Sequence, residues 1–267
     1  MSHLARRMSP LQQYAETACV ETGVDQRYQP THTVQLRLDE RTDYVHAYSI
    51  LQALSPALRK PDTTPVSLDR LQIRERITRD LFLSAGDTPH QTSYPGVKPA
   101  LEVAVSYDNG LQRVIYGYQF GPKITNRNDD PIGFLKGDNF PTSPELVDET
   151  IEAMGWRKNP GIFIANWLQT AAHSAGSPDT IQRIREFPPS LWSYRPLIHS
   201  AKGFQLPSHA DGASYGVASY VTKVTDVRPL ASLPNSRFIG TKVDIVKANK
   251  RIGGGKINFA ILPADMF

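Results

Sequence analysis

The sequence predicts an α+β protein whose antiparallel sheet is assembled from segments far apart in the chain. Apolar and alternating stretches over residues 32–38, 101–120 and 238–262 are typical of strands. Between them, the stretch 143–224 carries the proline and glycine signals that start and end helices. This order of elements favours α+β, and a ferredoxin-like core is one arrangement that fits it.

The hairpin over residues 101–120 has the strongest local signal. Asp108-Asn109-Gly110 separates two apolar stretches, and Asn-Gly tolerates the positive φ angles of a two-residue turn. Other elements are expected from apolar spacing and from proline and glycine boundaries. We predict helices over 10–24, 44–58, 67–85, 143–154, 162–175, 177–187 and 215–224, a long loop over 121–142, and strands over 238–246 and 257–262 that flank a glycine loop.

Length and composition favour a single ordered domain. The chain has 267 residues, of which 40% are hydrophobic and 21% are charged, and this is the ordinary globular range. We therefore predict one domain over residues 1–267, with a helical subdomain over 143–224 as the alternative.

Cysteine content and the lack of long apolar stretches bear on the compartment. Cys19 is the only cysteine, so an intrachain disulfide and a cysteine-based zinc site are both excluded. The sequence has no stretch of about 18 apolar residues that could cross a membrane. We expect a cytoplasmic protein.

Positive charge is concentrated near the C-terminus. Residues 237–256 hold six basic side chains and one acid, Asp244, whereas the whole chain has a net charge of only +4. Such a segment attracts phosphate, and a run of glycines lets backbone amides approach an anion. The predicted nucleic-acid site comprises Arg237, Lys242, Lys247, Lys250, Arg251, Gly253, Gly254, Gly255 and Lys256, with Arg70 and Arg74 from a second basic set.

Catalytic motifs are incomplete. Gly212-Ala213-Ser214-Tyr215-Gly216 matches a hydrolase nucleophile elbow, but no histidine follows Ser214. Tyr220-Val221-Thr222-Lys223 resembles the Tyr-x-x-Lys of rolling-circle replication initiators. Those enzymes hold a metal with two closely spaced histidines, and this sequence has no such pair.

Metal-binding patterns are equally weak. His199, His209 and Asp211 could meet at a metal, although polar loop residues explain their spacing as well. The acids at 129, 130 and 138 lie in turn-forming sequences. We expect no metal and no cofactor.

The favoured hypothesis is a non-catalytic protein that binds RNA or single-stranded nucleic acid within a larger complex, of the kind found in phages or mobile elements. Tyr107, Tyr116 and Tyr118 could stack on bases, although packing in the core is favoured for them. The alternatives are a viral or phage assembly protein and a metal-dependent nuclease. Whether the protein is an enzyme is left open, with a preference for no catalysis.

Overall fold

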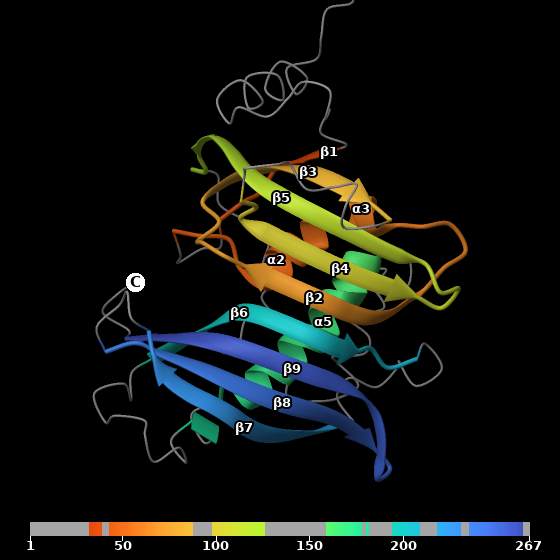
Figure 1. Ribbon diagram of the computed structural model, residues 1–267, viewed down its shortest axis with the longest axis vertical. Helices are drawn as coiled ribbons and strands as arrows, with labels where there is room; N and C mark the ends of the chain where they lie inside the picture. The colour runs from red at the N-terminus through yellow and green to blue at the C-terminus, as the bar shows by residue number, and fades with distance from the viewer. Residues whose placement is uncertain are drawn as a thin grey trace, which may run out of the picture.

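A single antiparallel sheet of nine strands dominates the computed structural model (Figure 1). The structure describes residues 32–38, 43–87, 98–125, 159–177, 180–181, 194–208, 218–230 and 235–263. The strand order is β1-β3-β5-β4-β2-β6-β9-β8-β7, and every neighbouring pair is antiparallel. The α+β class predicted from the sequence is therefore confirmed.

The described residues form three helices and nine strands. In chain order they are β1 (His32–Val34), α2 (Ala47–Ala53), α3 (Ser55–Leu58), β2 (Pro65–Ile73), β3 (Arg79–Gly86), β4 (Leu101–Tyr107), β5 (Gln112–Lys123), α5 (Pro160–Ala175), β6 (Tyr194–Gln205), β7 (Ser219–Pro229), β8 (Arg237–Lys247) and β9 (Lys250–Pro263).

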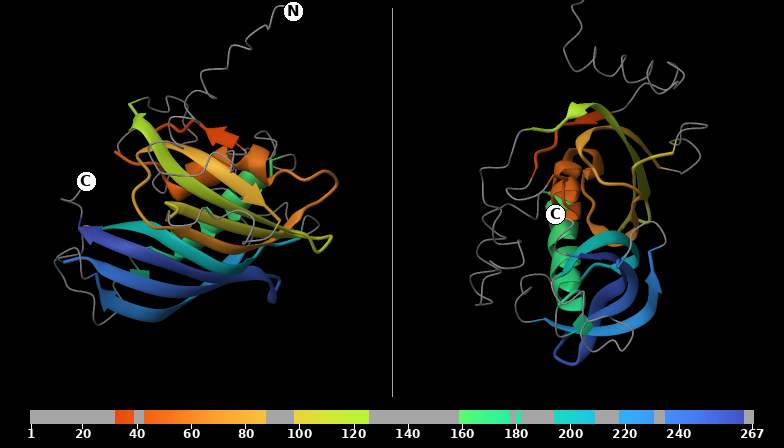
Figure 2. Two further views of the ribbon diagram at one scale, coloured as in Figure 1. Left: turned by 45° about the horizontal axis from the view of Figure 1, so that its top comes forward. Right: turned by 90° about the vertical axis from the view of Figure 1, so that its left-hand side faces the viewer.

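The sheet has two halves, each with its own helical element. Strands β1 to β5 curl around α2 and α3, and strands β6 to β9 curl around α5 (Figure 2). The halves join where β2 pairs with β6, with Leu71 opposite Ala201. Their connectivity differs, because β7, β8 and β9 form a meander whereas β5 lies between β3 and β4. The sheet is therefore continuous, but the halves are not simple copies of each other.

Helix α5 is apolar on almost every side, which is typical of a helix surrounded by protein. Pro160 stands in its first turn, and Gly176 caps its C-terminus. Trp167, Phe163 and Leu168 are all essentially inaccessible to solvent. Burying each such side chain stabilises the fold by about 1.5–3 kcal/mol. The sheet curls because only a curved layer can cover this helix.

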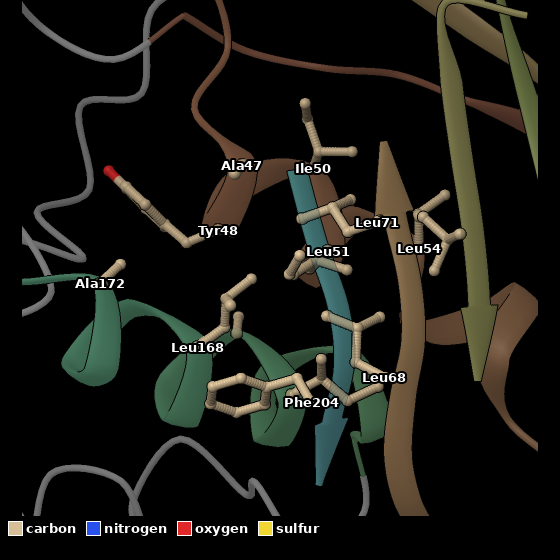
Figure 3. Close-up of a cluster of buried hydrophobic side chains, with 14 of the residues drawn as sticks. Ala47, Tyr48, Ile50, Leu51, Leu54, Leu68, Leu71, Leu168, Ala172 and Phe204 are labelled. Atoms are coloured by element: carbon tan, nitrogen blue, oxygen red, sulfur yellow. The ribbon is translucent and has the colours of Figure 1, made fainter. Parts of the chain in front are cut away.

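The two helical elements touch closely at Gly161. A Cβ at this position would lie 2.0 Å from the Leu51 carbonyl oxygen and 2.5 Å from Ser55 Oγ, so only glycine fits. Beside this contact, one cluster joins α2, α5 and the seam strands (Figure 3). Its labelled members are Ala47, Tyr48, Ile50, Leu51, Leu54, Leu68, Leu71, Leu168, Ala172 and Phe204.

Several predicted elements are confirmed. Strands appear at 32–34, 101–107, 112–123, 237–247 and 250–263, and helices appear at 47–58 and 160–175. The hairpin turn differs in type. The Gly110 N–H donates to the Tyr107 carbonyl at 2.9 Å, and only Gly110 in this loop has positive φ (80°), so the loop has three residues rather than two.

The helix predicted over 67–85 is wrong, because this segment forms β2 and β3. Leu68 and Leu71 both face the core, a spacing of three that mimics a helix. A β-bulge between Leu68 and Arg70 inserts one extra residue and produces this spacing within a strand. In β3, three consecutive residues from Leu81 to Leu83 are buried, because both faces of that strand are covered.

The helix predicted over 215–224 is also wrong, since its described part begins β7. Tyr220, Thr222 and Val224 are partly buried and alternate with exposed residues, which is the period of a strand. The ferredoxin-like core is wrong as well, because one sheet of nine strands wraps the helices. Within the proposed helical block 143–224, strands β6 and β7 belong to the common sheet, and α5 packs against that sheet. Single-domain organisation stays a prediction.

The glycine loop predicted near residues 253–255 is part of strand β9. The turn of this last hairpin is Ala248-Asn249, where both residues have positive φ (48° and 62°), as in a type I′ turn. Each of the three glycines instead allows another backbone to come close. A Cβ on Gly254, whose φ is +111°, would lie 2.1 Å from the Val243 carbonyl oxygen. These glycines are needed for strand packing.

The predicted helices over 10–24 and 143–154, and most of the loop 121–142 and of the helix 177–187, lie outside the described residues.

A glycine-to-alanine pair tests this packing role. Gly254→Ala should destabilise the protein by about 2 kcal/mol or more, because the methyl group would meet the Val243 carbonyl and the backbone would be strained. Gly203→Ala is the matched control, since its φ is also positive (+56°) but no atom lies within 4 Å of the new Cβ. The control should cost about 1 kcal/mol. Urea unfolding of both variants measures the difference, and equal losses would contradict the packing role.

Candidate functional site

The residues of the predicted nucleic-acid site do not gather around a loop. Lys247 and Lys250 flank the β8–β9 turn, whereas Arg237 begins β8 at its opposite end. Strand β8 has eleven residues, so its two ends, Arg237 and Lys247, lie about 33 Å apart. Lys242 and Lys256 face each other in mid-strand.

Arg70 and Arg74 are held by a buried acid rather than presented to a ligand. Arg70 Nη1 donates to Glu102 Oε1 at 2.7 Å, and Arg74 Nη2 donates to Glu102 Oε2 at 3.0 Å. The Glu102 side chain is only 7% exposed although it lies on the outward face of β4. Tyr116 stands opposite it on β5, and burial raises the pKa of its phenol. The Glu102 carboxylate thus pairs with both guanidinium groups, and the cluster keeps one net positive charge.

Arg251 is also engaged within the protein. Its guanidinium donates to Asp244 Oδ1 and to Gln205 Oε1, both at 2.7 Å, and to the Gly254 carbonyl at 3.3 Å. The hydrogen bond from Arg251 holds the pKa of Asp244 below its usual range. Arg251 thus fastens β9 to β8 and β6, which is a structural role.

The tyrosines considered for base stacking mostly serve the core. Tyr107 is buried, and its hydroxyl donates to the Leu58 carbonyl. Tyr118 is buried and stacks on Phe82, with ring centroids 4.9 Å apart. The core interpretation is confirmed for these two side chains.

His199 stands at an irregularity of β6, on the outward face at the seam between the halves. Its register with β9 slips between Ile198 and Ser200. Gln72 Nε2 lies 3.1 Å from His199 Nε2, and Phe238 contacts the ring edge-on at 6.0 Å between centroids. Burial lowers the pKa of His199, and the charges of Arg228 and Arg74 lower it further. His209 and Asp211, its suggested metal partners, lie outside the described residues.

A polar group that the sequence analysis missed lies inside the second half, where α5 faces β7. Asn166 has no exposed surface, and its amide nitrogen and oxygen both lack a hydrogen-bond partner in the described structure. One turn further along α5, Thr170 Oγ1 donates to the backbone carbonyl of Asn166 at 2.8 Å and is hydrogen-bonded to the Tyr220 hydroxyl of β7. Thr222 Oγ1, two residues along β7, is buried and unpartnered. We call Asn166, Thr170, Tyr220 and Thr222 the interior polar group.

The chemistry of the interior polar group is that of neutral hydrogen bonding. Burial raises the pKa of Tyr220 well above its ordinary value, so its hydroxyl keeps its proton at physiological pH. An amide supplies both donors and an acceptor to a ligand. These side chains can polarise a carbonyl group, but they carry no charge. The signal in the sequence was one asparagine in the apolar stretch 160–175. This stretch was predicted as a helix, but the amide was given no role.

Within the described residues, no group of three or more His, Cys, Asp or Glu side chains could hold a metal ion. No described helix combines the length and apolar character needed to cross a membrane.

The chain matches no protein-family model and no curated protein. Several solved structures are similar at low identity. The tesB protein of Mycobacterium avium subspecies paratuberculosis is 10% identical, with 94% of this chain and 100% of that chain covered and a TM-score of 0.41. The dehydratase domain of PpsC from Mycobacterium tuberculosis, in complex with C12:1-CoA, is 12% identical, with 82% and 85% covered and a TM-score of 0.35.

A third similar structure is a conserved hypothetical protein of Mycobacterium tuberculosis that is described as having a double hotdog fold. It is 10% identical, with 94% of this chain and 87% of that chain covered and a TM-score of 0.31.

The prediction of nucleic-acid binding is therefore wrong, both as function and as partner. The similar structures are a tesB protein and dehydratase domains. The expectation that the basic residues gather around an anion-binding glycine loop also fails. Arg70, Arg74 and Arg251 are paired with acids, and the three glycines hold strands together instead of forming an anion loop. The assembly-protein and nuclease alternatives are overturned with it.

The environment of His199 predicts a pH dependence of stability. Because the folded-state pKa of His199 is lowered, the unfolded chain binds the proton more tightly. Its contribution to stability should be complete above the unfolded value near pH 6.5 and should be lost as the pH falls through the folded value. His199→Gln should flatten this part of the profile. Urea unfolding between about pH 5 and 8 measures it, and an unchanged profile in the variant would contradict the assignment.

Proposed function

We propose that this protein is a double hotdog protein that binds fatty-acyl thioesters, with the thioester carbonyl held at Asn166. The observation that carries the proposal is the Asn166 amide, which is fully buried and lacks any hydrogen-bond partner in the described structure. Leaving a buried polar group unsatisfied costs about 1–3 kcal/mol. A ligand that completes these hydrogen bonds would recover that free energy.

The surroundings of Asn166 suit a ligand that is apolar except for one neutral polar group. Its neighbours along α5, including Phe163, Ala165 and Trp167, are buried and apolar. A fatty-acyl chain can pack against such a surface, whereas a carboxylate or phosphate would stay unpaired there. A thioester is neutral and offers one carbonyl acceptor. The acyl thioester is therefore the ligand class that fits both the amide and its environment.

Each residue of the interior polar group has a distinct part in this proposal. The Asn166 Nδ2 donates to the thioester carbonyl oxygen, which draws electron density away from the carbonyl carbon. The Tyr220 hydroxyl donates its one proton to Thr170 Oγ1, whose own proton goes to the Asn166 backbone carbonyl, so Tyr220 fixes α5 against β7 and leaves the ligand hydrogen bond to Asn166.

The names of the similar structures agree with the proposal. One is a tesB protein, and another holds C12:1-CoA. The hydrogen-bonding capacity of the buried Asn166 amide supports the proposal independently of these names. Location in the cytoplasm stays a prediction.

Asn166→Leu tests the proposal through two measurements that move in opposite directions. Leucine has the branching and the number of side-chain heavy atoms of asparagine but no hydrogen-bonding group, so the variant should be more stable than the wild type by about 1–3 kcal/mol, since the unsatisfied amide is gone. Its affinity for lauroyl-CoA should fall by about tenfold or more, since a carbonyl hydrogen bond is lost. Isothermal titration calorimetry measures the affinity, and urea unfolding measures the stability.

Ser55→Ala is the matched control. Ser55 Oγ is also buried and unpartnered, but it lies where α3 meets Gly161 on the other side of α5. This variant should gain stability and keep its affinity for lauroyl-CoA. Free coenzyme A should bind much more weakly than lauroyl-CoA if the acyl group is what is recognised. Wild-type protein that binds no acyl-CoA, or an Asn166→Leu variant that binds it normally, would overturn the proposal.

A further inference from the structure

The outward face of the sheet carries a row of lysines in direct cross-strand register. Lys202 of β6 is opposite Lys256 of β9, Lys256 is opposite Lys242 of β8, and Lys242 is opposite Lys223 of β7. Arg70 of β2 extends the row, because it is opposite Lys202. We call Lys202, Lys223, Lys242 and Lys256 the lysine row. In Figure 1 these strands lie one below another, with α5 behind them.

All four lysines point away from the core. Each is exposed, whereas the adjacent residues Ala201, Val243 and Ile257 are fully buried on the inner face. Because side chains alternate along a strand, the lysines occupy the outer surface of the sheet. Directly opposite positions bring Cβ atoms to about 4.5–5.5 Å. The row is therefore a line of like charges at close spacing.

The described residues supply little negative charge to neutralise the lysine row. Lys202, Lys223 and Lys256 have no acidic partner in the described part of the chain, and Lys242 has only a long contact of 3.5 Å with Asp244. That acid is already bound by Arg251 at 2.7 Å. Glu102, near the end of the row, is occupied by Arg70 and Arg74. Like charges opposite each other destabilise a sheet, so four in succession point to a partner that compensates them.

We propose that the lysine row is a docking surface for an acidic helix of a partner protein. Neighbouring strands lie about 4.8 Å apart, so the four lysines span about 14 Å. One turn of a helix rises about 5.4 Å, so carboxylates one turn apart along a helix laid across the strands match this repeat closely. Lysine is a flexible point charge, which suits carboxylates that are not held in fixed geometry.

The neighbouring outward positions favour a protein over a nucleic acid. On one side the row is bordered by Ser200, Asn258 and Gly240, and on the other by Gly254 and the acid Asp244. None of these side chains is aromatic, whereas binding of single strands relies on stacking platforms. This proposal does not depend on the acyl-thioester site, which lies on the opposite face of the sheet.

Two helical peptides of identical composition test the proposal. One carries glutamates on a single face at each helical turn, and the other distributes the same glutamates around the helix. Fluorescence anisotropy of the labelled peptides at low salt should show that the first binds about tenfold more tightly, and that its binding weakens as salt is added.

A double variant and its matched control locate the surface. Lys202→Glu with Lys256→Glu should weaken binding of the one-faced peptide by about tenfold or more and should raise the Tm, because repulsion within the row is relieved. Lys247→Glu with Lys250→Glu makes the same change in net charge at the β8–β9 turn, outside the row. This control should keep its affinity within about threefold.

Three outcomes would overturn the docking surface. They are equal affinity for the two peptides, equal loss of binding in the row variant and the control, and tighter binding of a labelled oligothymidylate than of the one-faced peptide.

Discussion

The enclosure of helix α5 is the constraint on which the rest of the structure depends. A helix that is apolar on nearly every side cannot face water, and no flat layer can cover it. The chain meets this requirement with long strands from both halves, joined at the pairing of β2 with β6. The contact at Gly161 sets how closely α5 approaches α2 and α3. The curl of the sheet, the seam and the glycines of β9 are all consequences of this enclosure.

The curled sheet separates two kinds of polar chemistry. Its concave side encloses neutral groups that lack partners in the described structure, above all the amide of Asn166 on α5. Its outer face carries charges, some paired within the protein, as in the Glu102 cluster, and some left in line, as in the lysine row. A buried neutral site selects ligands by hydrogen bonding in an apolar environment, whereas an exposed charged site selects partners by long-range attraction. The two proposals therefore concern different ligands on different faces.

The α+β class and the hairpins could be predicted because their signals are local. Asn109-Gly110 and the strands around residues 238–262 were found from turn chemistry and alternation. The helix expected at 67–85 failed because a β-bulge gave Leu68 and Leu71 a helical spacing, and no single sequence reveals a bulge. The charge around residues 237–256 was counted correctly, but the pairing of Arg251 with Asp244 depends on strand register. Register likewise created the lysine row from residues up to about fifty positions apart.

The strand order leaves the sheet with two edge strands of unequal length. One is β1, which has only three residues, and the other is β7, which has eleven. A long unpaired strand is a template on which another chain can add, and natural proteins protect such strands with charge and proline. Lys223, Arg228 and Pro229 place these residue types along β7. The same lysine that ends the row thus also guards the protein against edge-to-edge aggregation.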